Sequence, residues 1–312
     1  MTKKQSFRIE QDSLGDVKVP KKALWGAQTQ RAIENFPISG IKFKFPFGRS
    51  FIKALGAIKY SAASANHDLG LMTAKKANAI KASAKMVMVG DVDDHFPLDV
   101  FQTGSGTSTN MNANEVIAKL ATQKLGQDVN ANDDVNMSQS SNDTIPTAIC
   151  MSALFDMDEF LFPGLDLLIE EVEKKAKNLQ GQIKTGRTHM MDAMPLDFHQ
   201  ELMGWAAQLK SCKTSLTTAT KRMMQLPQGG TAIGTGVNSH RGFAKAFCQT
   251  IEKVSGFKVK PAPNFFQGLS SQDNSAELSS AVKNLALVVM KISNDLRSVS
   301  YTHLRAHETY KD

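Results

Sequence analysis

A polar, Gly-rich segment at residues 104–115, GSGTSTNMNANE, offers several side chains that can bind a carboxylate. Ser105 and Thr107 supply uncharged hydrogen-bond donors, and the small residues around them let the backbone approach a ligand. The helix expected to begin or continue near Asn114 adds free N–H groups that attract anions. The same composition is ordinary for a cap and turn, so this segment alone is equally compatible with binding and with capping.

A second polar segment, MSQSSNDTIP at residues 137–146, precedes a long predicted helix. Ser140, Ser141 and Asn142 place hydroxyl and amide groups where unpaired N–H groups and the helix dipole would hold a carboxylate. An N-cap needs only one such side chain, whereas this segment has several. We therefore interpret it as a binding segment.

A third segment, GRTHMMDAMP at residues 186–195, contains a histidine in polar company. An imidazole, with an ordinary pKa near ~6.5, can move protons at neutral pH, directly or through a bound water. Thr188 could orient a substrate carboxylate, and His189 is the strongest catalytic candidate in the chain. The alternative is a structural histidine satisfied by a backbone group. The histidines without such company are interpreted as structural or exposed: His67, His95, His199 and His240.

A Gly-rich segment at residues 229–236, GGTAIGTG, raises the question of phosphate binding. No Lys-Ser/Thr pair follows it as in a P-loop, and it does not join a strand to a helix ahead of an acidic residue. We expect it instead to allow tight backbone packing beside an active-site loop.

We expect long helices to position these segments, because strand-like patterns are scarce in the sequence. Residues 1–47 are expected to form an irregular arm with short β-like pieces. Apolar residues at helical spacing predict a bundle of long helices that completes its burial by oligomerising. The predicted helices cover residues 49–68, 144–179 with a kink at Pro163, 196–224 and 275–297.

The composition is that of a globular protein, with 41% hydrophobic and 21% charged residues among 312. This excludes disordered and membrane-spanning classes. The net charge of +7 is scattered over single and paired lysines, which disfavours nucleic-acid binding. A small anionic substrate explains a positive net charge as well as nucleic acid does. The cysteines form no CxxC pair and the N-terminus has no secretory pattern, so we expect a cytoplasmic protein without disulfides.

The ordered motifs resemble those of the fumarase/aspartase superfamily, and more narrowly of class II fumarase. The resemblance extends over residues 7–297 and adds LWGAQTQRAIENFPISG at residues 24–40 and a final NDLR. It implies a mainly α fold whose central bundle of long helices forms the core of a homotetramer. It also implies that His189 is the acid/base residue and that the substrate carboxylates are bound by Thr107, Ser140, Ser141, Asn142 and Thr188, with Ser105 adjacent.

The implied reaction is the reversible anti addition of water to fumarate to give (S)-malate, in the tricarboxylic acid cycle. The resemblance implies no metal and no organic cofactor, and the expected partners are a dicarboxylate substrate and other copies of the chain. Aspartate ammonia-lyase is the alternative enzyme. A catalytically dead fragment or structural homologue is the alternative from a different class.

The sequence departs from the family pattern in two places. Of the family's accessory carboxylate site only Asn132 and Asp133 are present, with Asn130-Ala131 where His-Pro is typical. The family's GSSxMPGKxNP loop, which contains its catalytic serine, does not occur in this sequence. We therefore expect the chain as written to be inactive and poorly folded, and its full-length parent to be active.

The resemblance and the helical pattern together predict three regions. Residues 1–143 should form an N-terminal mixed and helical lyase domain, and residues 144–297 a truncated central bundle. Residues 298–312 lack apolar periodicity and are expected to be a non-native tail that interrupts the last helix.

Overall fold

The computed structural model describes residues 6–42, 49–189 and 191–308, with side chains described up to Arg297. Helices dominate these residues, as the sequence predicts, and the strands form three two-stranded sheets. The chain divides into two compact units, which are described separately below. The first comprises Met1–Phe155 and Met223–Gln272, and the second Asp156–Arg222 and Asp273–Asp312. The domain boundaries expected from the sequence stay predictions.

The N-terminal arm is more regular than the sequence analysis predicted. Strands β1 (Phe7–Asp12) and β2 (Gly15–Pro20) form an antiparallel hairpin, and helix α1 (Ala27–Asn35) follows. The short β-like pieces expected here are confirmed by β1 and β2, whereas the expectation of an otherwise irregular arm is wrong at α1. Arg31 on α1 pairs with Asp12 at 2.9 Å, which attaches the helix to the hairpin.

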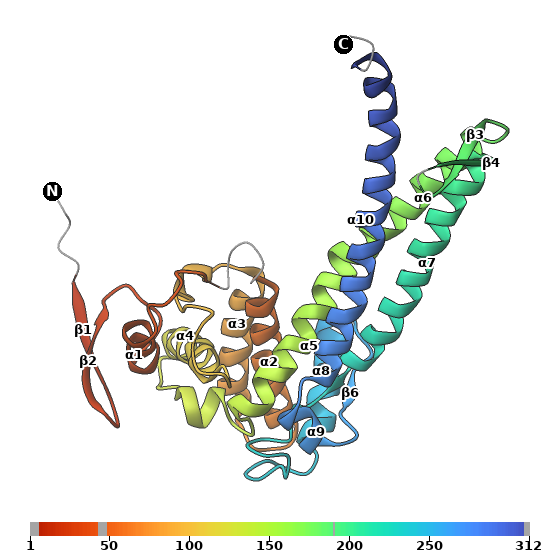
Figure 1. The fold of residues 1–312 in the computed structure, drawn as a ribbon. Helices are drawn as coiled ribbons and strands as arrows, with labels where there is room; N and C mark the ends of the chain where they lie inside the picture. Colours follow the sequence, from red (N-terminus) through yellow and green to blue (C-terminus); the bar gives the residue numbers. More distant parts are fainter. Residues whose placement is uncertain (1–5, 43–48, 190, 309–312) are drawn as a thin grey trace. The chain divides into compact units, whose positions relative to one another are not determined.

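The core of the first unit is a layer of three helices (Figure 1). Helix α2 (Arg49–Asp68) has the predicted bounds, and it packs on α3 (Ala74–Val89), which packs on α4 (Thr107–Leu125). Gly56 allows the close approach of α2 and α3, because an added Cβ would lie 2.9 Å from the Ala84 carbonyl oxygen. Residues 107–114, predicted to be loop, are the first turns of α4, since a run of buried side chains there gains from helical packing.

Smaller elements complete the first unit. They are the 3-10 turn η1 (Asp93–His95), helices α8 (Phe243–Ser255) and α9 (Phe265–Ser270), and the short parallel pair β5 (Gln225–Leu226) and β6 (Lys260–Pro261).

The three cysteines, Cys150, Cys212 and Cys248, are free and buried, as expected for small apolar side chains.

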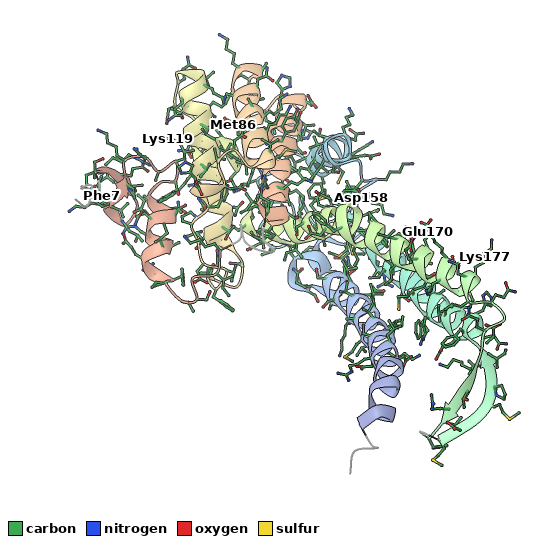
Figure 2. The ribbon with its side chains drawn as sticks, turned by 90° about the horizontal axis from the view of Figure 1, so that it is seen from above. Phe7, Met86, Lys119, Asp158, Glu170 and Lys177 are labelled. Carbon is green, nitrogen blue, oxygen red and sulfur yellow. The ribbon has the colours of Figure 1, made fainter. Side chains whose placement is uncertain are left out.

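The long helix predicted over residues 144–179 forms, with an irregular turn inside it. It comprises α5 (Ser141–Asp156), the π-helical turn η3 (Met157–Leu161) and α6 (Phe162–Asn178). The irregularity lies next to Pro163, whose missing N–H cannot continue the regular hydrogen-bond pattern. Figure 2 shows Asp158, Glu170 and Lys177 following one another along the part that belongs to the second unit.

The second unit contains α6, the antiparallel hairpin of β3 (Ile183–Thr188) and β4 (Met191–Asp197), α7 (Phe198–Met223) and α10 (Asp273–Glu308). Helix α7 closely matches its prediction. The interruption expected after Arg297 does not occur, because α10 continues to Glu308. Helices in the described part of the chain are all too short or too polar to cross a membrane.

Candidate active site

The first predicted segment places two exposed hydroxyls at the start of α4. Gly106 adopts a left-handed conformation (φ 65°) and α4 begins at Thr107. Gln102 occupies the buried side of this turn, because it accepts a 2.9 Å hydrogen bond from the Thr109 backbone N–H. The Ser105 and Thr107 hydroxyls lie 3.0 Å apart and are exposed, so they are available to a ligand.

The second segment forms the start of α5, where Ser140, Ser141 and Asn142 are consecutive. The Ser140 hydroxyl accepts a 3.2 Å hydrogen bond from the Asn142 N–H, and the Ser140 N–H donates a 2.9 Å bond to Asp143 Oδ1. One hydroxyl thus has a capping role, while Ser141 and the exposed Asn142 present further polar groups at the same helix end. The capping interpretation is therefore confirmed for Ser140, and the binding interpretation of this segment stays a prediction.

The starts of α4 and α5 are connected directly. Asn110 Nδ2, one turn into α4, donates a 3.2 Å hydrogen bond to the Ser141 hydroxyl. Asn142 Nδ2 donates a 2.7 Å bond to the Ala232 carbonyl of the Gly-rich segment. Three of the four motifs recognised in the sequence therefore meet in the first unit.

A cavity of about 430 Å³ lies where these three motifs meet. Of the predicted binding residues, Ser105 and Asn142 line it, whereas Thr107, Ser140 and Ser141 do not, and Ser270 and Gln272 add further polar side chains. The rest of its wall is mainly apolar and includes Ile145, Pro146, Ile149, Ile233, Phe266 and Leu269. The cavity thus combines a few neutral polar side chains with a mainly apolar wall, which is typical of sites for small molecules.

A buried lysine forms hydrogen bonds with the segment that leads into α5. Lys59 of α2 is fully buried, and its amino group donates to Asn136 Oδ1 at 2.9 Å and Gln139 Oε1 at 3.0 Å. Asn136 Oδ1 also accepts from Asn110 at 3.2 Å and Asn114 at 3.1 Å. Burial lowers the pKa of Lys59 to about 7. Lys59 was not predicted from the sequence, where its one signal is its position among the apolar residues of ALGAIKYSAAS.

Asp143, which follows the cavity residue Asn142 in the chain, is a second buried ionisable group. Its carboxylate accepts 2.9 Å hydrogen bonds from the N–H groups of Ser140, Gly229 and Thr231. Burial raises its pKa to about 6, although the three hydrogen bonds and the charge of Lys59 act in the opposite direction.

The remaining two candidates, Thr188 and His189, lie in the second unit, at the tip of the β3/β4 hairpin. Both are exposed, and His189 has a left-handed backbone (φ 52°), which is uncommon for a residue other than glycine. Arg187 opposes Asp192 across the hairpin and pairs with it at 3.3 Å, which stabilises the turn. The exposed position leaves the imidazole accessible to solvent, and its catalytic role stays a prediction.

A cavity of about 460 Å³ lies against this hairpin. Thr188 and Arg187 line it, together with Lys184, whose amino group is 2.7 Å from Glu201 of α7. Glu201 and Asp295 also line this cavity, so its basic residues are accompanied by carboxylates, and His189 lies next to Thr188 in the chain but is not part of the lining.

The accessory residues Asn132 and Asp133 lie in a π-helical turn, η2 (Ala131–Val135), and are exposed. Their backbone N–H groups donate to Asn130 Oδ1 at 2.8 and 3.0 Å. Asn130 is thus used as a cap of this turn, and an accessory site here stays a prediction.

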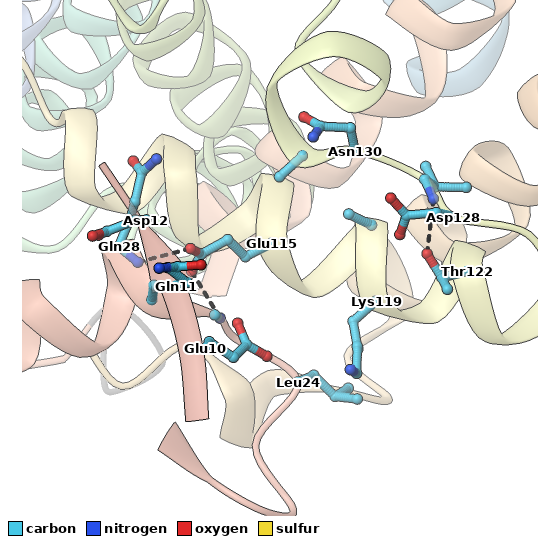
Figure 3. A pocket seen from close by; sticks show the side chains of 15 residues that line it. Glu10, Gln11, Asp12, Leu24, Gln28, Glu115, Lys119, Thr122, Asp128 and Asn130 are labelled. Carbon is cyan, nitrogen blue, oxygen red and sulfur yellow. Dashed lines mark hydrogen bonds between the residues drawn. The ribbon is translucent and has the colours of Figure 1, made fainter. Parts of the chain in front are cut away.

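A cavity of about 390 Å³ beside this turn has an acidic lining, including Glu10, Asp12, Glu115 and Asp128 (Figure 3). Glu115 is committed to the protein itself, since its carboxylate accepts hydrogen bonds from the N–H groups of Gly26, Gln28 and Thr29 at 2.9 to 3.1 Å. Its role is to hold the start of α1.

Comparisons with known proteins give a consistent set of relatives. A family profile described as a lyase matches residues 15–310. The class II fumarate hydratase of Xylella fastidiosa (strain Temecula1) is 49% identical over 297 residues, covering 95% of this chain and 62% of that protein. The mitochondrial fumarate hydratase of Homo sapiens is 45% identical over 303 residues, covering 95% of this chain and 59% of the relative. The chain thus spans about three fifths of the length of these relatives.

Solved structures resemble the fold closely. The class II fumarase of Schistosoma mansoni superposes with a TM-score of 0.89 at 35% identity, covering 93% of this chain and 64% of that one. The fumarate lyase:delta crystallin of Brucella melitensis in its native form gives 0.85 at 34% identity, covering 94% and 66%.

Proposed function

This chain belongs to the lyase family whose profile covers residues 15–310, and on that premise we propose that its protein is a class II fumarate hydratase. The proposed reaction interconverts fumarate and (S)-malate by reversible anti addition of water. The observation that supports it best is the direct connection of α4 to the start of α5, from Asn110 to the Ser141 hydroxyl, beside a cavity that Ser105 and Asn142 line.

Recognition of the substrate follows from the two helix starts. Free N–H groups and the helix dipoles favour negative charge there, and Thr107, Ser140, Ser141 and Asn142 add neutral donors. Neutral donors suit a carboxylate that gains charge during the reaction, because they stabilise the added electron density without requiring a permanent counter-ion. Ser105 and Thr188 complete the proposed binding set.

The chemistry is a proton transfer coupled to the loss or gain of hydroxide. In the direction from malate, a base removes the C3 proton, and the electron pair is held as an aci-carboxylate by the surrounding donors. The hydroxyl group then leaves from C2 with a proton supplied by an acid, which forms the double bond and water. We propose that His189 handles the water and hydroxyl, since its exposed imidazole can exchange protons with solvent.

The protein is proposed to be a homotetramer built on the helices of the second unit. Several large apolar side chains of these helices are exposed in the single chain, among them Leu167 at 61%, Met290 at 56%, Leu296 at 55% and Leu287 at 49%. Exposed apolar surface of this kind is typical of an interface between subunits. A cytoplasmic location stays a prediction, and among the relatives the human protein is named as mitochondrial.

The test is a substrate comparison on the protein encoded by the reading frame that contains these 312 residues. The purified protein should convert fumarate to malate and should release no ammonia from aspartate. Ammonia release without hydration would replace the proposal by aspartate ammonia-lyase. The absence of both activities would favour a structural homologue.

A further inference from the structure

We propose that Asp143 is a positioning residue, which fixes the start of α5 and the Gly-rich segment 229–236 in the arrangement that binds the dicarboxylate. The inference rests on the proposed function for the identity of the ligand. The role of Asp143 in joining the two segments rests on geometry alone.

The carboxylate of Asp143 joins two segments that are far apart in sequence. Oδ1 accepts from the Ser140 N–H at 2.9 Å, and Oδ2 accepts from the N–H groups of Gly229 and Thr231, both at 2.9 Å. Asp143 is 0% exposed, so water does not compete for these bonds. Hydrogen bonds to a buried carboxylate are stronger than those between neutral groups.

The joined segments both form the wall of the candidate site. Asn142, next to Asp143, lines the 430 Å³ cavity with Ala232 and Ile233 of the Gly-rich segment. The 2.7 Å bond from Asn142 Nδ2 to the Ala232 carbonyl connects them a second time, at the cavity surface. Asp143 therefore determines where the Asn142 amide and the Ser140 N–H lie relative to the opposite wall.

An amide cannot replace this carboxylate without losing a bond. Because donors lie on both oxygens, an asparagine in either orientation points its NH₂ group at a backbone N–H, toward Ser140 or toward Gly229 and Thr231. The buried Lys59 amino group favours the ionised form of Asp143, which is the form that accepts all three bonds. Asp143→Asn therefore keeps the size of the side chain and removes its ability to join both segments.

The experiment compares Asp143→Asn with Asp91→Asn, whose exposed aspartate lies in the same unit. Residue-resolved amide hydrogen exchange should be about tenfold faster or more at Ser140, or at Gly229 and Thr231, in Asp143→Asn only. Its KM for fumarate should rise about tenfold while kcat falls less, because carboxylate binding is disturbed and proton transfer is not.

Unchanged exchange at all three amides, or a loss of kcat with an unchanged KM, would overturn the proposal. If Asp143→Asn does not fold, hydrogen exchange in the unsubstituted protein tests the proposal. Its Gly229 and Thr231 amides are expected to exchange slowly, and exchange at the rate of exposed amides would overturn the proposal. A protein with slow exchange at these amides but no fumarate hydration would refute the proposed function and leave the role of Asp143 as the connection between the two segments intact.

Discussion

The amino group of Lys59 lies 2.9 Å from Asn136 Oδ1, in the interior of the first unit. A buried lysine next to neutral amide oxygens is poorly stabilised in its charged form, and desolvation lowers its pKa to about 7. Asn136 Oδ1 also accepts a hydrogen bond from the Asn110 side-chain amide. The same Asn110 amide donates a hydrogen bond to the Ser141 hydroxyl at 3.2 Å. The lysine is thus connected to the candidate substrate-binding residues through two amide side chains.

Substitution of Lys59 should change how stability depends on pH. Between its folded pKa of about 7 and its ordinary value of 10.5, the unfolded chain binds a proton that the folded chain lacks. The free energy of unfolding therefore rises with pH in this window, by at most about 1.4 kcal/mol per pH unit for one group. Denaturant unfolding at several pH values should show this slope in the unsubstituted protein and a smaller one in Lys59→Met. An unaltered slope would contradict the prediction, and Lys85→Met, at an exposed lysine of α3, is the control.

Removal of the Glu115 carboxylate should destabilise the first unit. In Glu115→Ala the N–H groups of Gly26, Gln28 and Thr29 lose their acceptor, and the Thr29 hydroxyl loses a 2.5 Å bond to Oε2. We expect the free energy of unfolding to fall by about 3 kcal/mol, because several donors lose one partly buried charged acceptor. Equilibrium unfolding measures the change, and Glu34→Ala, at an exposed position of α1, should cost less than about 0.5 kcal/mol. Equal losses in the two variants would show that Glu115 does not hold α1.

The packing of the Gly-rich segment against α8 can be tested at Gly229, its first residue. Its backbone is left-handed (φ 107°), and an added Cβ would lie 2.6 Å from Ala244 Cβ. Gly256 is also left-handed (φ 81°) but has open space around it, so Gly256→Ala should cost about 1–2 kcal/mol from conformation alone. Gly229→Ala should cost about 1–3 kcal/mol more, because of overpacking. Thermal or denaturant unfolding of both variants gives the comparison, and similar losses would rule out tight packing of Gly229 on α8.

The parts of the fold that the sequence predicts are those with local signals. The bounds of α2 follow from apolar residues at helical spacing, and α7 follows in the same way. The β3/β4 hairpin was missed because its side chains are mostly exposed, including Met191 at 70% and Met194 at 79%, so its apolar residues do not mark a buried strand face. The continuation of α10 past Arg297 was missed because backbone hydrogen bonding can extend a helix without apolar periodicity.

The candidate site likewise contains residues that have a local signal in the sequence and residues that have none. Ser105, Thr107, Ser140, Ser141 and Asn142 could be selected from the sequence, because hydroxyl and amide residues before a helix are a local pattern. Asp143 and Lys59 could not be assigned their roles in this way. Their partners, Gly229 and Asn136, are 86 and 77 residues away, and only the folded chain brings them together.

The proposed acid/base role of His189 is the centre of the account, and one kinetic comparison tests it most directly. Fumarate hydration by the encoded protein is measured for the unsubstituted form, for His189→Asn, and for His67→Asn as the control at a partly exposed histidine of α2. His189→Asn should lower kcat by about 10²- to 10⁴-fold with little change in KM, while His67→Asn should match the unsubstituted protein. Hydration that proceeds in His189→Asn at an undiminished kcat would contradict the account.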